Sequence, residues 1–112
     1  MRSEVINDLE HVLIKCITAC ETCATKCLNE DNVKMMADCI KTDLDCAAIC
    51  QLTSVYLARK SRFTKQTLRL CIEICKACEA ECRKHEHEHC QHCAEICHEC
   101  HIACEDYLGN LN

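Results

Sequence analysis

The sequence of 112 residues has no proline, no tryptophan and a single glycine, and its only aromatic residues are two tyrosines and one phenylalanine. So few turn-forming residues argue against an all-β fold and against a loop-rich disulfide mini-protein. Apolar runs of membrane-spanning length are also missing, so we expect no contact with a membrane. The net charge is −5 and the cations form no basic stripe, so we expect no nucleic-acid partner.

What the sequence has in excess is cysteine, with 16 residues. The first 13 residues lack the apolar stretch of a signal peptide, so we expect a cytoplasmic protein. In that compartment glutathione and thioredoxin keep thiols reduced. Disulfides between cysteines three or four apart would also close very small loops and stabilise the fold little. The cysteines therefore point to bound metal.

The cysteines recur at intervals of three and four residues, which is the period of one face of an α-helix. An interval of two, which a strand would need, never occurs. Asp43 stands where a further cysteine would complete the pattern of the second group. The four groups are Cys16, Cys20, Cys23 and Cys27; Cys39, Cys46 and Cys50; Cys71, Cys75, Cys78 and Cys82; and Cys90, Cys93, Cys97, Cys100 and Cys104.

Each group predicts one helix with a narrow stripe of sulfur. We expect an all-α protein, a single domain over residues 1–112, folded as an antiparallel up-down-up-down four-helix bundle with the cysteines lining its core. The predicted helices run from about Ser3 to Asn29, from Asp31 or Asn32 to Lys60, from Ser61 or Thr64 to Lys84, and from the segment between Glu86 and His89 to Gly109.

The two ends of this bundle differ in their side chains. At one end, the closed end, the stripes continue as hydrocarbon: Val5, Leu9, Val12, Leu57, Leu68 and Leu108, with Tyr56, Phe63 and Tyr107 expected nearby or at a subunit contact. At the other, the open end, thioether, imidazole and thiol groups gather, and we predict that metal ions are taken up there. The candidate uptake residues are Met35, Met36, His85, His87 and His89, beside Cys27, Cys82 and Cys90.

Thiolate ligands favour Cu(I), zinc or iron–sulfur clusters. Four tetrahedral zinc sites would bury eight excess negative charges, whereas one Cu(I) per thiolate leaves the core neutral. Cu(I) also accepts two or three sulfurs, so pairs such as Cys16 and Cys20 are suitable clamps. The ferredoxin cysteine motif is missing, and no strand accompanies the CxxC pairs as in thioredoxin-like enzymes.

Several polar residues on or near the stripes remain ambiguous. For Asp43 we expect a partly solvated carboxylate paired with a Lys or Arg; the alternatives are a hydrogen bond near Cys39 or a role as an oxygen ligand. For His101, core packing and metal ligation are equally open. His11, His92 and His98 fall on outer helix faces and are expected at the surface.

The sequence resembles the cytosolic copper storage proteins in CITACETCATKCLNE at 16–30, DCIKTDLDCAAIC at 38–50, LCIEICKACEAECRKHEHEHCQHCAEIC at 70–97 and CHECHIAC at 97–104. The resemblance implies storage of many Cu(I) ions by the 16 cysteines, without catalysis, and a homotetramer of bundles. Relatives often have histidines where Met35 and Met36 stand. A copper chaperone or a copper-requiring enzyme is the implied exchange partner. The alternatives are a Cu(I) delivery or sensing module and a thiolate-based zinc-binding protein.

Overall fold

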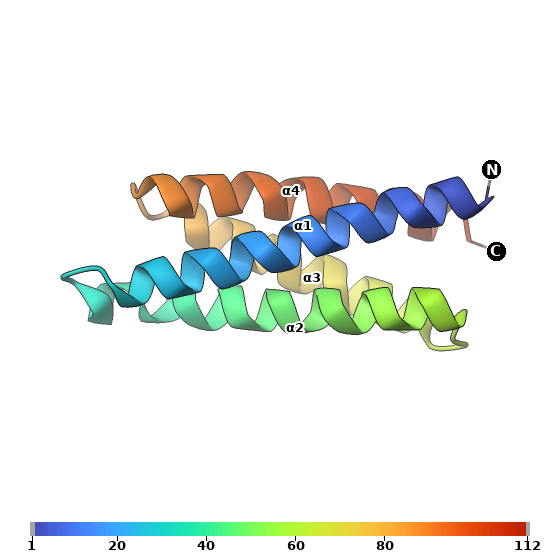
Figure 1. Ribbon diagram of the computed structural model, residues 1–112, viewed down its shortest axis with the longest axis horizontal. Coiled ribbons are helices and arrows are strands. Elements are labelled where there is room, and N and C mark those ends of the chain that lie inside the picture. The colour runs from blue at the N-terminus through green and yellow to red at the C-terminus, as the bar shows by residue number, and fades with distance from the viewer. Residues whose placement is uncertain (1, 112) are drawn as a thin grey trace.

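The computed structural model describes residues 2–111, and the side chains of residues 8–111. It forms the expected bundle of four long α-helices, joined by short connections and without a strand in the described range (Figure 1). The side chain of Val5, which is expected at the closed end, lies outside the described side chains. The elements are α1 (Arg2–Leu28), the short 3-10 helix η1 (Val33–Met36), α2 (Ala37–Arg59), α3 (Thr64–Arg83) and α4 (Glu88–Gly109).

The four helices form an elongated bundle that measures about 47 × 20 × 17 Å and is nearly square in cross-section. Along its sides, α1 packs against α2 and α4, and α3 packs against the same two helices. The α1–α2 and α3–α4 connections lie together at the open end, and the α2–α3 connection lies with both termini at the closed end (Figure 1). In the described part of the chain, no helix is both long and apolar enough to cross a membrane.

The start of the second helix differs from the prediction. The segment expected to be helical from Asp31 or Asn32 is a turn followed by η1, and α2 begins only at Ala37. In η1 the backbone is wound more tightly than an α-helix, with about three residues per turn. This winding leaves Met35 73% exposed but places Met36 in the core, where it is 2% exposed. The other helix boundaries lie close to the predicted ones.

The closed end is filled with hydrocarbon, as predicted. Leu9, Leu57 and Leu68 are each at most 3% exposed, and the described side chains of Val12, Tyr107 and Leu108 pack against this core. Each buried leucine contributes roughly 1.5–3 kcal/mol to stability through the hydrophobic effect. Phe63 differs, because it is 47% exposed in the α2–α3 connection, with the Arg62 guanidinium 4.9 Å from its ring centre.

Two threonines are also buried at this end, and both are satisfied locally. Thr53 donates its hydroxyl proton to the Ile49 carbonyl at 2.7 Å, and Thr67 donates to the Phe63 carbonyl at 2.9 Å. Because both hydroxyls donate to a backbone carbonyl four residues earlier, neither of these two buried threonines keeps a free polar proton.

Candidate metal centre

All 16 cysteines point into the bundle, and each is at most 1% exposed. The helical period explains this result, because residues three and four apart on an α-helix share a face. Every cysteine is a free thiol. The interior between the two ends is thus built from sulfur where an ordinary bundle would have leucine and isoleucine.

The sulfur atoms lie close to one another within and between helices. Contacts between Sγ atoms range from 3.4 Å for Cys46 and Cys75 to 4.0 Å for Cys16 and Cys20. Cys46, for example, contacts one sulfur atom on each of the other three helices: Cys16 on α1, Cys75 on α3 and Cys97 on α4. At such separations an ion between two sulfurs needs only small side-chain rotations to be bound by both.

These contacts join into a network along the bundle. Sets of four sulfur atoms lie within 4.8 Å of one another, and the four sets deeper in the bundle share members, whereas the set at the open end is joined to them through Cys39 and Cys82. Cys78 joins to Cys82 at 3.9 Å, Cys82 to Cys39 at 3.6 Å, and Cys104 to Cys71 at 3.9 Å. The network therefore includes every cysteine. The sets include Cys23, Cys27, Cys39 and Cys90; Cys20, Cys78, Cys93 and Cys97; Cys16, Cys20, Cys46 and Cys97; Cys16, Cys46, Cys50 and Cys75; and Cys50, Cys71, Cys75 and Cys100.

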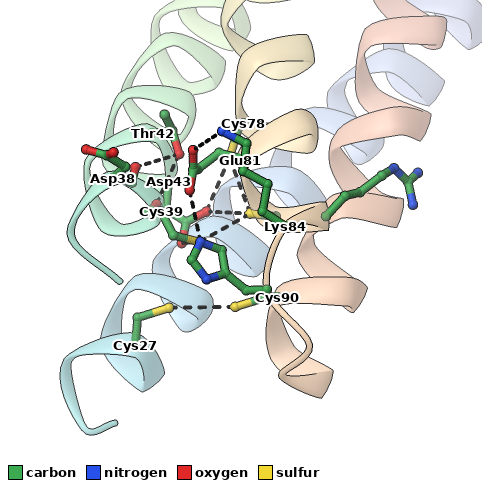
Figure 2. Close-up of polar contacts among 12 residues, drawn as sticks. Cys27, Asp38, Cys39, Thr42, Asp43, Cys78, Glu81, Lys84 and Cys90 are labelled. Carbon is green, nitrogen blue, oxygen red and sulfur yellow. Dashed lines mark hydrogen bonds and ion pairs between the residues drawn. The ribbon is translucent and has the colours of Figure 1, made fainter. Parts of the chain in front are cut away.

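Asp43 lies inside this network, and the expectation of a solvated ion pair is wrong. Its side chain is fully buried and extends from α2 toward α3 (Figure 2). The thiols of Cys78, Cys82 and Cys93 donate to its Oδ1 atom at 3.2 to 3.4 Å, and that of Cys39 lies 3.9 Å from Oδ2. Four thiol contacts replace the water that the carboxyl group loses on folding, which is how a polar group is accommodated in a core.

Burial of Asp43, together with the neighbouring Cys93 and Cys78 sulfurs, raises the pKa of its carboxyl group to about 10. This group is therefore protonated and uncharged at neutral pH. Burial likewise raises the pKa of the Cys27 thiol to about 11, and also raises the pKa of Cys90. The thiols of Cys27 and Cys90 are thus neutral in the metal-free protein and must lose their protons to bind a metal ion.

Of the expected uptake residues, His89 lies directly on the sulfur network. Its Nδ1 atom is 3.5 Å from the sulfur of Cys23, 3.6 Å from that of Cys90 and 3.9 Å from that of Cys27. Its Nε2 atom is 3.6 Å from Glu30, too far for a hydrogen bond, and is buried without a hydrogen-bond partner. The imidazole therefore turns Nδ1 toward three thiols and keeps Nε2 without a hydrogen bond. Cys27 and Cys90, also 3.9 Å apart, face each other there (Figure 2).

The other expected uptake residues lie further from the sulfurs. His85 is bound to Glu81 at 2.9 Å, and the Nε2 atom of His87 lies 2.6 Å from Glu30. Met35 is exposed, whereas Met36 is buried in the same core cluster as the cysteines. Sequence reasoning missed Glu30 as a neighbour of His87 and His89, because it lies in the α1–α2 connection, far along the chain from both histidines.

A groove of about 650 Å³ reaches this region from the side, between α1 and α4. Cys23 and His89 contribute to its lining, together with Lys15, Lys26 and His92. Cys23 is nevertheless 1% exposed, so its sulfur lies at the bottom. Solvent therefore approaches the sulfur network between two helices, in addition to the end of the bundle named by the sequence analysis.

The remaining histidines are not directed at the sulfur network. His101 is 6% exposed, and its ring nitrogens contact Glu79 and Glu105. His11, His92 and His98 are exposed on outer faces, as predicted. The structure therefore places His101 away from the sulfurs, buried among polar partners on α3 and α4.

Residues 2–109 match the family of copper storage proteins. A cysteine-rich protein of Bacillus subtilis strain 168, YhjQ, is 45% identical over 78 residues, which are 70% of this chain and 72% of that protein. A cytosolic copper storage protein from Streptomyces lividans, in a structure with five coppers, is 37% identical, with a TM-score of 0.94 over 97% of this chain and 96% of its own.

The S. lividans protein is also similar in a structure loaded with 10 copper equivalents, at 38% identity and a TM-score of 0.93, over 96% of this chain and 86% of its own. Metal-free copper storage protein 3 from Bacillus subtilis is 39% identical, with a TM-score of 0.86 over 91% of this chain and 97% of its own. With a family match over nearly the whole chain, the protein belongs to the copper storage proteins.

Proposed function

We propose that the protein stores Cu(I) in the interior of the bundle and that all 16 cysteine thiolates are its ligands. The observation that carries this proposal is the sulfur network, in which four sets of four atoms share members and the fifth is joined to them by sulfur–sulfur contacts. A shared sulfur suits bridging between ions. Cu(I) accepts two or three sulfur ligands, so one thiolate can serve two ions. The S. lividans relative with five and ten coppers supports a store of many ions per chain.

Charge favours copper over zinc as the stored ion. A tetrahedral zinc site with four thiolates keeps an excess charge of −2, which is costly in an interior shielded from water. One Cu(I) ion per thiolate neutralises the same interior completely. Asp43 is uncharged at neutral pH and adds no further negative charge. Because carboxylate is a poor ligand for Cu(I), we assign Asp43 the role of holding the thiols of Cys39, Cys78, Cys82 and Cys93 in place before loading.

Ions enter at the open end, and His89 is the residue that receives them. A neutral imidazole binds soft and borderline ions without first losing a proton, whereas the thiols of Cys27 and Cys90 have raised pKa values. His89 therefore holds an ion while a neighbouring thiol deprotonates. His85, His87, Met35 and Met36 surround this position and form the outer part of the uptake path.

The protein works in the cytoplasm, without catalysing a reaction, and exchanges copper with a copper chaperone or a copper-requiring enzyme. The S. lividans relative, described as cytosolic, supports this location. We further propose a homotetramer of bundles. Leu44, Leu52 and Val55 lie on α2 and are between 41% and 47% exposed, which provides apolar surface for a contact between copies.

Anaerobic titration of the reduced protein with Cu(I), followed by metal analysis, tests the proposal. Storage predicts many ions per chain, close to or above one per cysteine. A delivery module would saturate at one or two ions, and a zinc-binding protein at about four zinc ions, from its four-thiolate sites. Saturation at either low value would overturn storage. Sedimentation of wild-type protein and Leu52→Glu tests the tetramer, because a buried charge at the contact would separate the copies.

A further inference from the structure

A second group of metal-ligating side chains lies outside the sulfur interior, where α3 meets α4. Glu79 comes from α3, and His98 and His101 come from α4, one helical turn apart. The two imidazole rings are in contact, with centres 5.0 Å apart and nearly perpendicular planes. None of these residues contacts a cysteine sulfur among the hydrogen-bonded contacts described above.

Both imidazoles direct a nitrogen atom at the same carboxylate oxygen. His101 Nε2 lies 2.8 Å from Glu79 Oε1, and His98 Nδ1 lies 3.2 Å from the same atom. Two nitrogens and one oxygen thus converge on one small region. A zinc ion bound by imidazole and carboxylate needs ligand atoms about 2.0–2.2 Å away, so small rotations of these three side chains would make room for it.

Neighbouring side chains bind the atoms of Glu79 and His101 that face away from the converging oxygen and nitrogens. Arg83 donates two hydrogen bonds to Glu79 Oε2, at 2.8 and 2.6 Å, which leaves Oε1 free to face the histidines. His101 Nδ1 lies 3.2 Å from Glu105, which is paired in turn with Lys76 at 3.3 Å. A carboxylate on the distal nitrogen of a histidine fixes its tautomer and orientation, and this is the usual environment of a metal-bound histidine.

From this arrangement we propose that Glu79 Oε1, His98 Nδ1 and His101 Nε2 bind a divalent first-row transition-metal ion, with zinc as the foremost candidate. Imidazole and carboxylate are borderline and hard ligands, so the site discriminates against Cu(I), which the sulfurs take. The side chain of His101 is 8% exposed and that of Glu79 is 15%, whereas that of His98 is 53% exposed. Two of the three ligands, Glu79 and His101, are therefore largely buried, and the ion enters from the solvent on the side of His98. A fourth coordination position is left for water.

The bound ion links α3 to α4 on the outside of the bundle. It acts independently of the copper store, because its ligands are separate from the thiols. Since the metal binds only the folded arrangement of these two helices, it stabilises the bundle by mass action. The site thus gives the protein a means to respond to divalent metal while its interior holds Cu(I).

The test uses protein that has first been saturated with Cu(I) under anaerobic conditions, so that its thiolates are occupied, and then titrated with Co(II) as a spectroscopic probe. We expect one Co(II) ion per chain, with visible absorption from nitrogen and oxygen ligands and without thiolate-to-Co(II) charge transfer. His98→Ala is expected to weaken this binding at least about tenfold, and Glu105→Gln about tenfold, through loss of the charge that orients His101.

His92→Ala is the matched control, because His92 is an exposed histidine on the same helix. It is expected to leave Co(II) binding unchanged. Cu(I) capacity should be the same in all three variants, which separates this site from the copper store and shows that the variants fold. Lack of Co(II) binding to the loaded protein, charge-transfer bands from thiolate, or an affinity unaffected by His98→Ala would each overturn the proposal.

Discussion

The two ends of the bundle have the same backbone architecture but opposite side-chain chemistry. At the closed end, Leu9, Leu57 and Leu68 fill the space between the helices, and the buried threonines are bound to their own backbones. At the open end, His89 contacts three thiols and keeps one nitrogen without a hydrogen bond. The helical backbones therefore determine which side chains face the interior, and the residue type at a few stripe positions determines where an ion can pass.

The largest expected effect comes from filling the interior with copper. Metal-free protein should already be folded, because the closed end is packed with hydrocarbon and buried thiols behave as small apolar groups. Loading should raise the melting temperature by at least about 15 °C, since even one site at a thousandfold its Kd adds about 4 kcal/mol. Circular dichroism of metal-free and loaded protein measures this shift.

Loading should also reduce the difference in amide hydrogen-exchange rate between the two ends. Amide hydrogen exchange in metal-free protein should be slower at the closed end, and copper should slow exchange most near Cys27 and Cys90. About one proton should be released per thiolate formed. Metal-free protein without helical circular dichroism would contradict this account, because folding would then depend on the ions.

Removing hydrocarbon from the closed end is expected to have the second-largest effect. Leu68 is fully buried, so Leu68→Ala should lower the free energy of unfolding of metal-free protein by about 2–5 kcal/mol. Leu70→Ala is the control on the same helix, because Leu70 is 46% exposed and its replacement should cost less than about 0.5 kcal/mol. Urea denaturation measures both values.

The rate of Cu(I) uptake by Leu68→Ala provides a second measurement on the same variant. The cavity left by Leu68→Ala has no ligand for an ion, so the uptake rate should equal that of wild-type protein. Faster uptake would show that the closed end is only a steric barrier, and that the chemical difference between the ends is not what directs the ions.

The third-largest effect is expected from replacing Asp43, which lies on the inner side of the open end. Its folded-state pKa, about 10, lies above its ordinary value of 3.8, so folding takes up a proton at pH values between these limits. The stabilising contribution of the neutral acid is complete below about pH 4 and is lost as the pH rises toward 10. Asn needs no proton, so at pH 8 Asp43→Asn should unfold with a free energy on the order of 1–3 kcal/mol higher than wild-type protein.

The gain from Asp43→Asn should shrink as the pH falls from 8 to 5, because the unfolded carboxylate comes closer to its own pKa. Urea denaturation of metal-free protein at several pH values provides the measurement. Asp45→Asn is the matched control, since Asp45 lies on the exposed face of the same helix. A variant that is less stable than wild-type protein at pH 8 would show that the thiols around Asp43 require a charged carboxylate.

The sequence was sufficient to predict the helices and the buried sulfur, because both follow from one helical period. It was insufficient at Asp43, where a general preference of carboxylates for water was outweighed by four thiol contacts from three helices. His101 was ambiguous for a related reason. Its partner Glu79 is 22 residues away on α3, and contacts between helices cannot be read from spacing within one of them.

The start of α2 shows a further limit. A stripe of apolar residues does not distinguish an α-helix from a short 3-10 helix, because both place residues three apart on neighbouring positions. Met35 and Met36 therefore seemed equivalent in the sequence. In the structure one is exposed and the other is buried. The uptake residues predicted at this end thus divide into His89, which contacts three sulfurs, Met36, which is buried in the cysteine cluster, and others that are exposed or paired with carboxylates.

The last prediction concerns the rate at which ions cross the open end. His89→Leu should slow Cu(I) uptake and removal about tenfold, which corresponds to about 1.4 kcal/mol in the barrier, because an arriving ion then first meets the protonated thiols of Cys27 and Cys90. His87→Leu should have a smaller effect, since His87 is held by Glu30 away from the sulfurs, and Met35→Leu should have almost none. Stopped-flow measurements with a chromophoric Cu(I) chelator give these rates.

His92→Leu is the control for the His89 variant, because this exposed histidine lines the same groove but does not contact a sulfur atom among the described contacts. Capacity should be unchanged in all of these variants, since the sixteen thiols remain. A wild-type rate in His89→Leu would mean that ions reach Cys23 or Cys90 directly and that the imidazole is dispensable. A capacity that falls together with the rate would make His89 a storage ligand, and the open end would then be part of the store.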